Sequence, residues 1–244
     1  MKKSLCIYFL FISFSSFCQD VDAFGKQASK ESQAYYFYRQ QLSEPPYGLK
    51  WIKEKILHRK YGASDTESNR IFYQSLSLRE KFTYNMIHAE SYSQICSAFP
   101  MEGPDEEKKI FAQLPIMFSE YKWSEKQQKF FSDNRDSVIY LMKECISKTG
   151  QVGLNFKKVI VNINAKEMVL PFINLYHRTK KDRDILTVLM LLMKNNKYQP
   201  FLSTAIAKKL YGAAASYKEF SFFKPADQEQ IIEYAGKFYN DAIK

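Results

Sequence analysis

Residues 134–142 read NRDSVIYLM and residues 182–190 read DRDILTVLM, and these two stretches, 48 residues apart, align without a gap. Each places an aspartate at its start and an aliphatic stripe after it. That pattern is typical of an amphipathic helix whose N-terminus is stabilised by a carboxylate. Similar helical periodicity continues through most of the chain from residue 21 onward. We therefore predict an all-α protein with about ten to twelve helices.

The two aligned stretches resemble HEAT-type helical repeats, in which short helix pairs recur at a spacing of roughly 40–50 residues. The resemblance covers roughly residues 105–212. It implies a short, right-handed α-solenoid-like array in which each helix pair packs against the next. The alternative is an irregular single-core helical bundle, in which the two stretches share only a common start pattern.

Several further signals locate individual helices. Ser77 with Glu80, and Ser124 with Gln127, have the spacing of capping boxes, which satisfy the free amides of a helix start. The first box predicts a helix that continues to about Ala98. The β-branched stretch 152–164 is predicted as a helix, with a strand as the alternative, because no partner strand is evident in the sequence.

Pro100 and Pro104 mark the clearest break in the chain. They separate an N-terminal helical region, residues 19–99, from a C-terminal region, residues 105–244, and we expect the two to form one continuous mature unit. Because Pro104 is followed by three acidic residues, it predicts a helix start. This helix is expected to extend to Tyr121 with a kink at Pro115.

The N-terminus has the pattern of a cleavable secretory signal peptide. Lys2 and Lys3 precede an apolar run over 5–14, which is about half the length that crosses a bilayer. Ser16 and Cys18 supply the small residues that favour cleavage after residue 18. We therefore expect an exported protein, periplasmic or secreted, whose mature chain begins at Gln19.

Two alternatives exist for this N-terminal segment. A short membrane anchor is disfavoured because the apolar run is short and no stop-transfer cluster of charges follows it. A lipoprotein acylated at Cys18 is disfavoured because the large Phe17 precedes the cysteine.

Charge and composition limit the classes of partner. Removing residues 1–18 takes away two lysines and no acid, so the formal charge falls from +10 to +8 over about 226 residues. A composition of 45% hydrophobic and 25% charged residues excludes a disordered chain. An exported basic protein meets anionic lipid, acidic polysaccharide or acidic protein, and we do not expect nucleic acid as a partner. The alternative is that the lysines are dispersed over solvated helix faces.

Two cysteines, Cys96 and Cys145, remain after cleavage in a compartment where disulfides form. The sequence permits a bridge between them. It equally permits two buried thiols that pack as small hydrophobic side chains.

Signatures of common enzymes are missing from the sequence, including His-Glu-x-x-His, Cys-x-x-Cys and the phosphate-binding loop. One polar row stands out: Glu80, Tyr84 and His88, followed by Tyr92, recur every four residues and so share a face of the predicted helix. A carboxylate, a phenol and an imidazole in line are candidates for catalysis. The alternative is a helix margin whose histidine is hydrogen-bonded to a neighbouring element.

A second candidate surface is basic and includes an aromatic side chain. It is a candidate for binding anionic lipid or glycan, and it consists of Lys50, Trp51, Lys53, Lys55, Arg59 and Lys60. The alternative is a solvated helix face, because Glu54 interrupts the positive charges and the apolar side of this helix is needed for packing.

Export, helical patterning and the missing catalytic signatures together favour a binding or scaffold module for a protein or cell-envelope component. No cofactor or metal is expected for such a module. The alternatives are a cell-envelope enzyme, a hydrolase or metal-dependent, built around His88, and a peripheral binder of anionic surfaces through residues 50–60.

Overall fold

The computed structural model describes residues 28–61, 66–93, 103–216 and 218–243, and within them the all-α prediction is confirmed. The N-terminal region contains α1 (Lys30–Gln40), α2 (Leu49–Tyr61), α3 (Thr66–Ser75), α4 (Leu78–Ile87) and β1 (Ser91–Tyr92). The C-terminal region contains η2 (Glu106–Lys108), β2 (Lys109–Phe111), β3 (Tyr121–Lys122), α5 (Glu125–Asp133), α6 (Arg135–Thr149), α7 (Leu154–Asn162), η3 (Lys166–Met168), α8 (Val169–Thr179), α9 (Asp184–Asn195), α10 (Gln199–Leu202), α11 (Ala205–Tyr211), β4 (Phe220–Phe222) and α12 (Pro225–Ile243).

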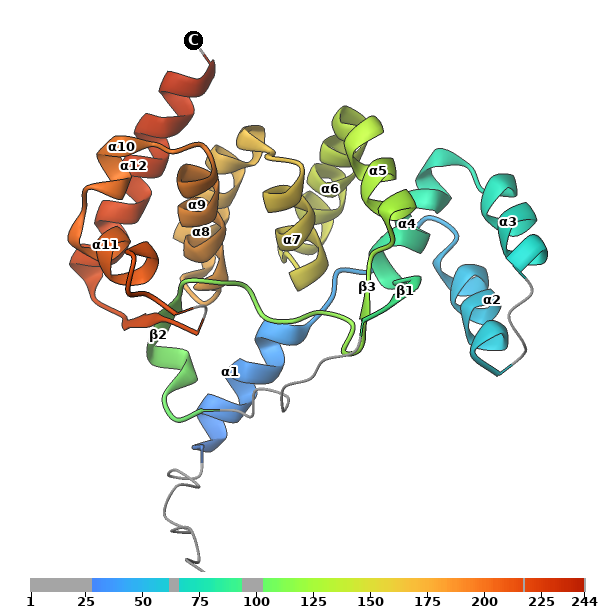
Figure 1. The fold of residues 1–244 in the computed structure, drawn as a ribbon, viewed down its shortest axis with the longest axis horizontal. Coiled ribbons are helices and arrows are strands. Elements are labelled where there is room, and N and C mark those ends of the chain that lie inside the picture. Colours follow the sequence, from blue (N-terminus) through green and yellow to red (C-terminus); the bar gives the residue numbers. More distant parts are fainter. Residues whose placement is uncertain (1–27, 62–65, 94–102, 217, 244) are drawn as a thin grey trace, which may run out of the picture.

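The helices from α2 and α3 to α12 stand in one curved row, and α1 and the segment after β2 lie along one side of that row, below it in the view of Figure 1. Neighbours in the row pack directly, as α2 does on α4, α4 on α7, α7 on α9, and α9 on α8 and α12. Within the described ranges the strands form two short antiparallel pairs, β1 with β3 and β2 with β4.

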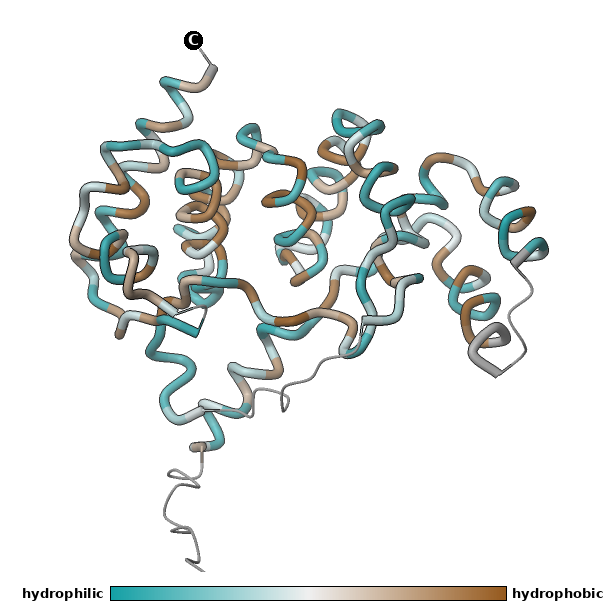
Figure 2. The backbone as a smooth tube through the Cα atoms, viewed as in Figure 1, coloured by the Kyte–Doolittle hydropathy of each residue, from teal (hydrophilic) through white to brown (hydrophobic). Residues whose placement is uncertain are grey.

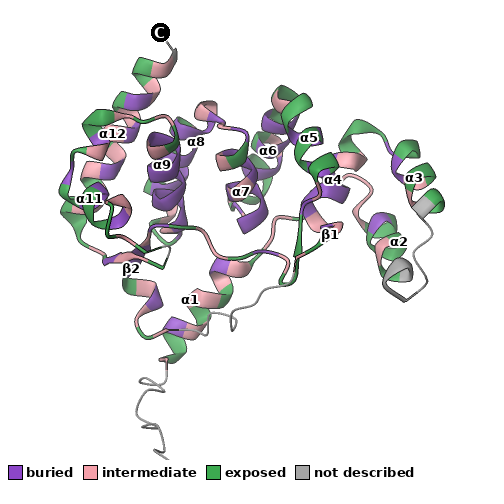
Figure 3. Cartoon of the chain, in the orientation of Figure 1, coloured by how far each residue is buried: buried purple, intermediate pink, exposed green. Residues whose placement is uncertain are grey.

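The centre of the core is α9, the helix that contains all but the first two residues of the stretch 182–190. Every residue from Asp184 to Met193 is buried, and α9 appears apolar in Figure 2 and buried along its length in Figure 3. A helix that is apolar all round must be surrounded by other elements. Here α7, α8, α12 and β2 surround it.

A second, smaller core joins the α2–α3 pair to α4. It consists of Ile52, Tyr73, Leu76 and Tyr84. The α2–α3 pair projects from one end of the row (Figure 1). This small cluster attaches the pair to α4.

The structure confirms several local predictions. Both capping boxes are present, at Ser77 with Glu80 and at Ser124 with Gln127. Residues 154–162 form the helix α7, so the helical prediction for 152–164 holds within these bounds.

Two predicted helix spans are wrong. The helix that begins at Ser77 ends at Ile87 and not near Ala98, because the chain turns extended at His88, and residues 94–102 lie outside the described part. Residues 104–121 form no long helix. There, Ile110 and Ala112 are buried in alternation along an extended chain, and Pro115 cannot continue a helix.

A buried ionic cluster fastens α1 to the row of helices. The guanidinium of Arg39 donates through Nε to both carboxylate oxygens of Asp184, each at 3.1 Å, and through Nη1 to Glu106 at 3.1 Å. The same guanidinium lies 3.7 Å from the centroid of the Phe111 ring. The buried residues of α1 are Ser32 and Arg39, both polar. The contact between α1 and the row therefore depends on this ionic cluster and not on packed apolar side chains.

The cluster continues onto α7. Lys157 Nζ lies 2.7 Å from Asp182 Oδ1 and 4.0 Å from Asp184 Oδ2, and all three side chains are nearly inaccessible to solvent. Burial raises the pKa of Asp182, which Lys157 opposes. A buried charge is tolerated only with such partners, so the cluster couples α1, α7 and the start of α9.

The hydrogen-bonded and partly buried Tyr211 predicts a loss of stability in alkali. The Tyr211 hydroxyl donates to the carbonyl of Ala112 at 3.1 Å, and burial raises the Tyr211 pKa far above its ordinary value. The unfolded chain releases this proton near pH 10, so the stability present below pH 10 is lost above it, by about 1.4 kcal/mol per pH unit. In urea unfolding between pH 8 and 11.5, Tyr211→Phe should show a shallower decline than the parent protein. Parallel declines would contradict this assignment.

Candidate functional site

Two adjoining hollows meet at Leu78, between α3 and α4 on one side and α5 and α6 on the other. Their volumes are about 420 Å³ and 400 Å³. Together we name them the Leu78 groove. It is lined by Tyr73, Leu78, Arg79, Lys81, Lys126, Lys129, Phe130, Asp133, Asn134, Asp136, Ser137, Tyr140 and Leu141.

The first capping box positions one wall of the groove. Ser77 Oγ accepts from the backbone N–H of Glu80, and the Glu80 carboxylate accepts from the backbone N–H of Ser77 at 2.9 Å. The Ser77 hydroxyl also donates to the Glu80 carboxylate at 2.7 Å, and this bond together with the one from the Ser77 backbone N–H lowers the pKa of Glu80. Because the box starts α4 at Leu78, it places Leu78 and Lys81 one helical turn apart on this wall.

The second capping box and a buried polar network hold the opposite wall. Gln127, in the first turn of α5, donates through Nε2 to Asn85 Oδ1 at 3.1 Å and to the carbonyl of His88 at 2.8 Å. Asn85 Nδ2 in turn donates to the Tyr73 hydroxyl at 3.0 Å. Buried hydrogen bonds among Tyr73, Asn85 and Gln127 therefore connect the two walls and make the groove rigid.

The groove combines apolar side chains that are open to solvent with others that are buried beneath them. Leu78 is 40% exposed and Tyr140 is 61% exposed, whereas Phe130 and Leu141 are almost fully covered. Exposed apolar side chains gathered at a hollow, with polar groups at the rim, are typical of binding surfaces.

The positive charges of the groove are only partly paired. Lys129 lies 2.9 Å from Asp133, and Arg79 lies 3.1 Å from Glu144. Lys81 and Lys126 instead place their ammonium groups over the ring of Tyr73, at 5.6 and 3.8 Å from its centroid. Within the described residues, neither of these two ammonium groups lies within 4.0 Å of a carboxylate.

The predicted row of Glu80, Tyr84 and His88 is interrupted, because α4 ends before His88. The Glu80 side chain belongs to the capping box, and the Tyr84 hydroxyl donates to Glu90 Oε1 at 3.0 Å. His88 packs its ring against Tyr84, with centroids 5.1 Å apart, and Tyr92 belongs to the strand β1. None of these residues lines the Leu78 groove. Their catalytic role stays a prediction, without the shared helix face on which it was based.

The basic stretch of α2 presents Lys50, Lys53 and Lys55 to solvent. Trp51 packs edge-on against Phe72, and Lys53 pairs with Glu44 at 2.6 Å. The side chains of Arg59 and Lys60 lie outside the described part. Binding of anionic lipid or glycan by this stretch stays a prediction.

Cys145 is buried in α6 and forms no disulfide with another described residue, and burial raises the pKa of its thiol. Cys96 lies outside the described residues, so the predicted pairing of the two is not tested. Among the described residues no three histidine, cysteine or acidic side chains are grouped to hold a metal ion.

Sequence reasoning missed the Leu78 groove as a site, although it located both of the helix starts that line it. Lys81, Lys126 and Lys129 look in the sequence like ordinary charges on solvated faces. In the tertiary structure Lys81 and Lys126 meet at the ring of Tyr73, and Lys129 lines the same hollow.

Comparisons with protein-family models, with curated proteins and with solved structures found no match to this chain. Over the described ranges, no helix has the length and apolar character required to cross a membrane.

Proposed function

We propose that the protein is an exported, non-catalytic helical module that binds an acidic segment of a partner protein of the cell envelope in the Leu78 groove. The observation that carries this proposal is the coincidence of half-exposed apolar side chains with two lysines that lack acidic partners among the described residues. An acidic, partly apolar ligand complements both features.

The chemistry of the groove supports binding over catalysis. No histidine or cysteine lines it, and it is open to solvent, so it does not exclude water from a reacting group. Its walls are held by capping boxes and a buried polar network, which is the preorganisation that favours affinity. The open shape also favours a protein segment over a lipid, whose acyl chains need an enclosed or apolar environment.

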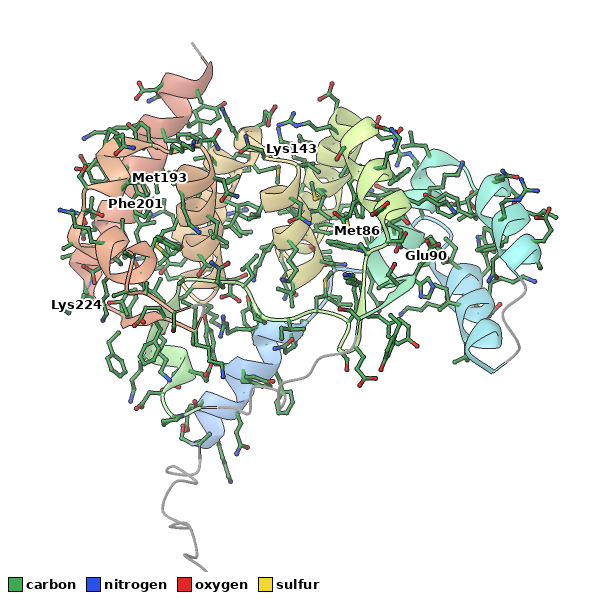
Figure 4. The ribbon with its side chains drawn as sticks, viewed as in Figure 1. Met86, Glu90, Lys143, Met193, Phe201 and Lys224 are labelled. Carbon is green, nitrogen blue, oxygen red and sulfur yellow. The ribbon has the colours of Figure 1, made fainter. Side chains whose placement is uncertain are left out.

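The test compares two groove variants with a charge-matched control. Leu78→Asp places a carboxylate at the apolar position where the two hollows meet. Lys81→Glu/Lys126→Glu reverses the charges of the two lysines that have no acidic partner among the described residues. The control, Lys208→Glu/Lys224→Glu, makes the same change in net charge on α11 and just before α12. Lys224 lies at the far end of the row from α4 (Figure 4).

Mature protein, the two groove variants and the control are each immobilised and exposed to a solubilised envelope extract, with circular dichroism confirming that all are folded. We expect a partner that is retained by the mature protein and the control but lost from both groove variants. After purification, its Kd should rise at least about tenfold for either groove variant, which corresponds to about 1.4 kcal/mol. Identical retention by the mature protein and Leu78→Asp would overturn the proposal.

A further inference from the structure

Tyr73 is contacted by two lysines from different helices. Lys81 comes from α4 and Lys126 from α5, yet both ammonium groups approach the same ring. The hydroxyl of that ring accepts a hydrogen bond from Asn85, which fixes the position of the ring. Two positive charges near one ring repel each other, and a bound anion that contacts both relieves that repulsion.

The elements around the groove determine which backbone conformation fits it. Its lining residues come from α3, α4, α5 and α6 and from the link between α5 and α6, so no strand edge is available to pair with an extended peptide. A bound extended segment would therefore gain no backbone hydrogen bonds from the groove, whereas a helix satisfies its own N–H and C=O groups.

Spacing along α4 determines the register. Leu78 and Lys81 are three residues apart on one helix, which is a rise of about 4.5 Å. Residues three or four positions apart on a second helix lie side by side at a matching rise of about 4.5–6 Å. A helix that runs along the groove can therefore meet Leu78 with an apolar side chain and the lysines with an acidic one.

Charge also differs along the groove. Lys81 and Lys126 line one hollow, whereas Asp136, whose side chain is fully exposed, lines the other together with Arg79 and Tyr140. The two lysines favour a carboxylate in the first hollow, and Tyr140 favours an apolar side chain in the second.

Building on the proposed function, we infer that the Leu78 groove takes an acidic amphipathic helix. One carboxylate of this helix bridges Lys81 and Lys126 over Tyr73, and an apolar residue three or four positions along contacts Leu78. The class of partner is therefore a protein with an amphipathic helix whose acidic and apolar residues share one face.

Three synthetic peptides of about sixteen residues, each locked as a helix by a hydrocarbon staple, test this inference. The first places Glu and Leu three or four positions apart on one face. The second has the same composition with Glu moved to the opposite face, and the third replaces that Glu by Gln. Binding to the mature protein is followed by fluorescence anisotropy at low and at physiological salt.

We expect the first peptide to bind at least about tenfold more tightly than either of the others. In Lys81→Gln/Lys126→Gln the advantage of Glu over Gln should disappear, while the Lys208→Gln/Lys224→Gln control should keep it. Equal binding of the first two peptides, with loss of both in Leu78→Asp, overturns the helical register but leaves the groove as a binding surface. If no peptide binds while an envelope partner still requires Leu78, the inference again fails alone. A partner that ignores Leu78 overturns the proposed function as well.

Discussion

Arg39→Leu is expected to lower the free energy of unfolding by about 3–5 kcal/mol, a large share of the stability of a typical protein. The substitution removes the hydrogen bonds to Asp184 and Glu106 and leaves two buried carboxylates without their main cationic partner. It also removes the guanidinium that lies over Phe111. Urea unfolding at pH 7, followed by circular dichroism, measures the loss.

Two further variants separate charge from geometry at this position. Arg39→Lys keeps the positive charge but loses the two-pronged contact with Asp184, so we expect an intermediate loss. Arg39→Leu/Asp184→Leu removes both partners of the closest pair and should lose less than Arg39→Leu alone, because one fewer unpaired charge stays buried. A stability of Arg39→Leu within about 1 kcal/mol of the parent would show that the cluster does not hold α1.

Gly153→Ala is expected to destabilise the protein by about 3 kcal/mol, at the upper end of the usual cost of overpacking. A Cβ at this position meets the backbone nitrogen of Ser43 at 2.0 Å and the carbonyl carbon of Leu42 at 2.5 Å. Backbone atoms cannot rotate away as a flexible side chain can. The clash would also separate Gly153 N–H from Ser43 Oγ, at 2.7 Å, and Leu154 N–H from the carbonyl of Gln41, at 2.8 Å.

Gly236→Ala provides the matched control for this prediction. Gly236 lies within α12, and nothing lies within 4 Å of a Cβ built there. Alanine is the better helix former, so this variant should gain about 0.5–1 kcal/mol. If both glycine variants change stability equally in thermal and urea unfolding, close approach of the chain at Gly153 is not the cause.

Local features were predictable because they depend on neighbours in the chain. The capping boxes at Ser77 and Ser124 and the helix α7 required only residues within a few positions of one another. The helix predicted over 104–121 is wrong because a helix does not continue through Pro115. The short alternation of Ile110 and Ala112 there signals an extended segment, which pairing with β4 and contact with α9 then stabilise.

The candidate site depended on contacts that local patterns do not contain. Tyr73 and Lys126 meet although 53 residues separate them in the sequence, and nothing near either residue specifies the other. The predicted row through His88 was lost for a related reason. The end of α4 at Ile87 coincides with hydrogen bonds from Gln127 on α5 to the His88 carbonyl and from the Glu90 N–H to Gln127.

The sequence by itself determined that this protein is all-α and where several of its helices begin, because capping residues and apolar periodicity act within one or two turns. It also indicated the central helix through the stretch 182–190. Only the tertiary structure decided that Arg39 joins Asp184 across 145 positions and that Lys81 and Lys126 converge on one tyrosine ring. Such contacts follow from how whole helices pack, since burial of the apolar face of each helix determines which polar side chains meet at the edges.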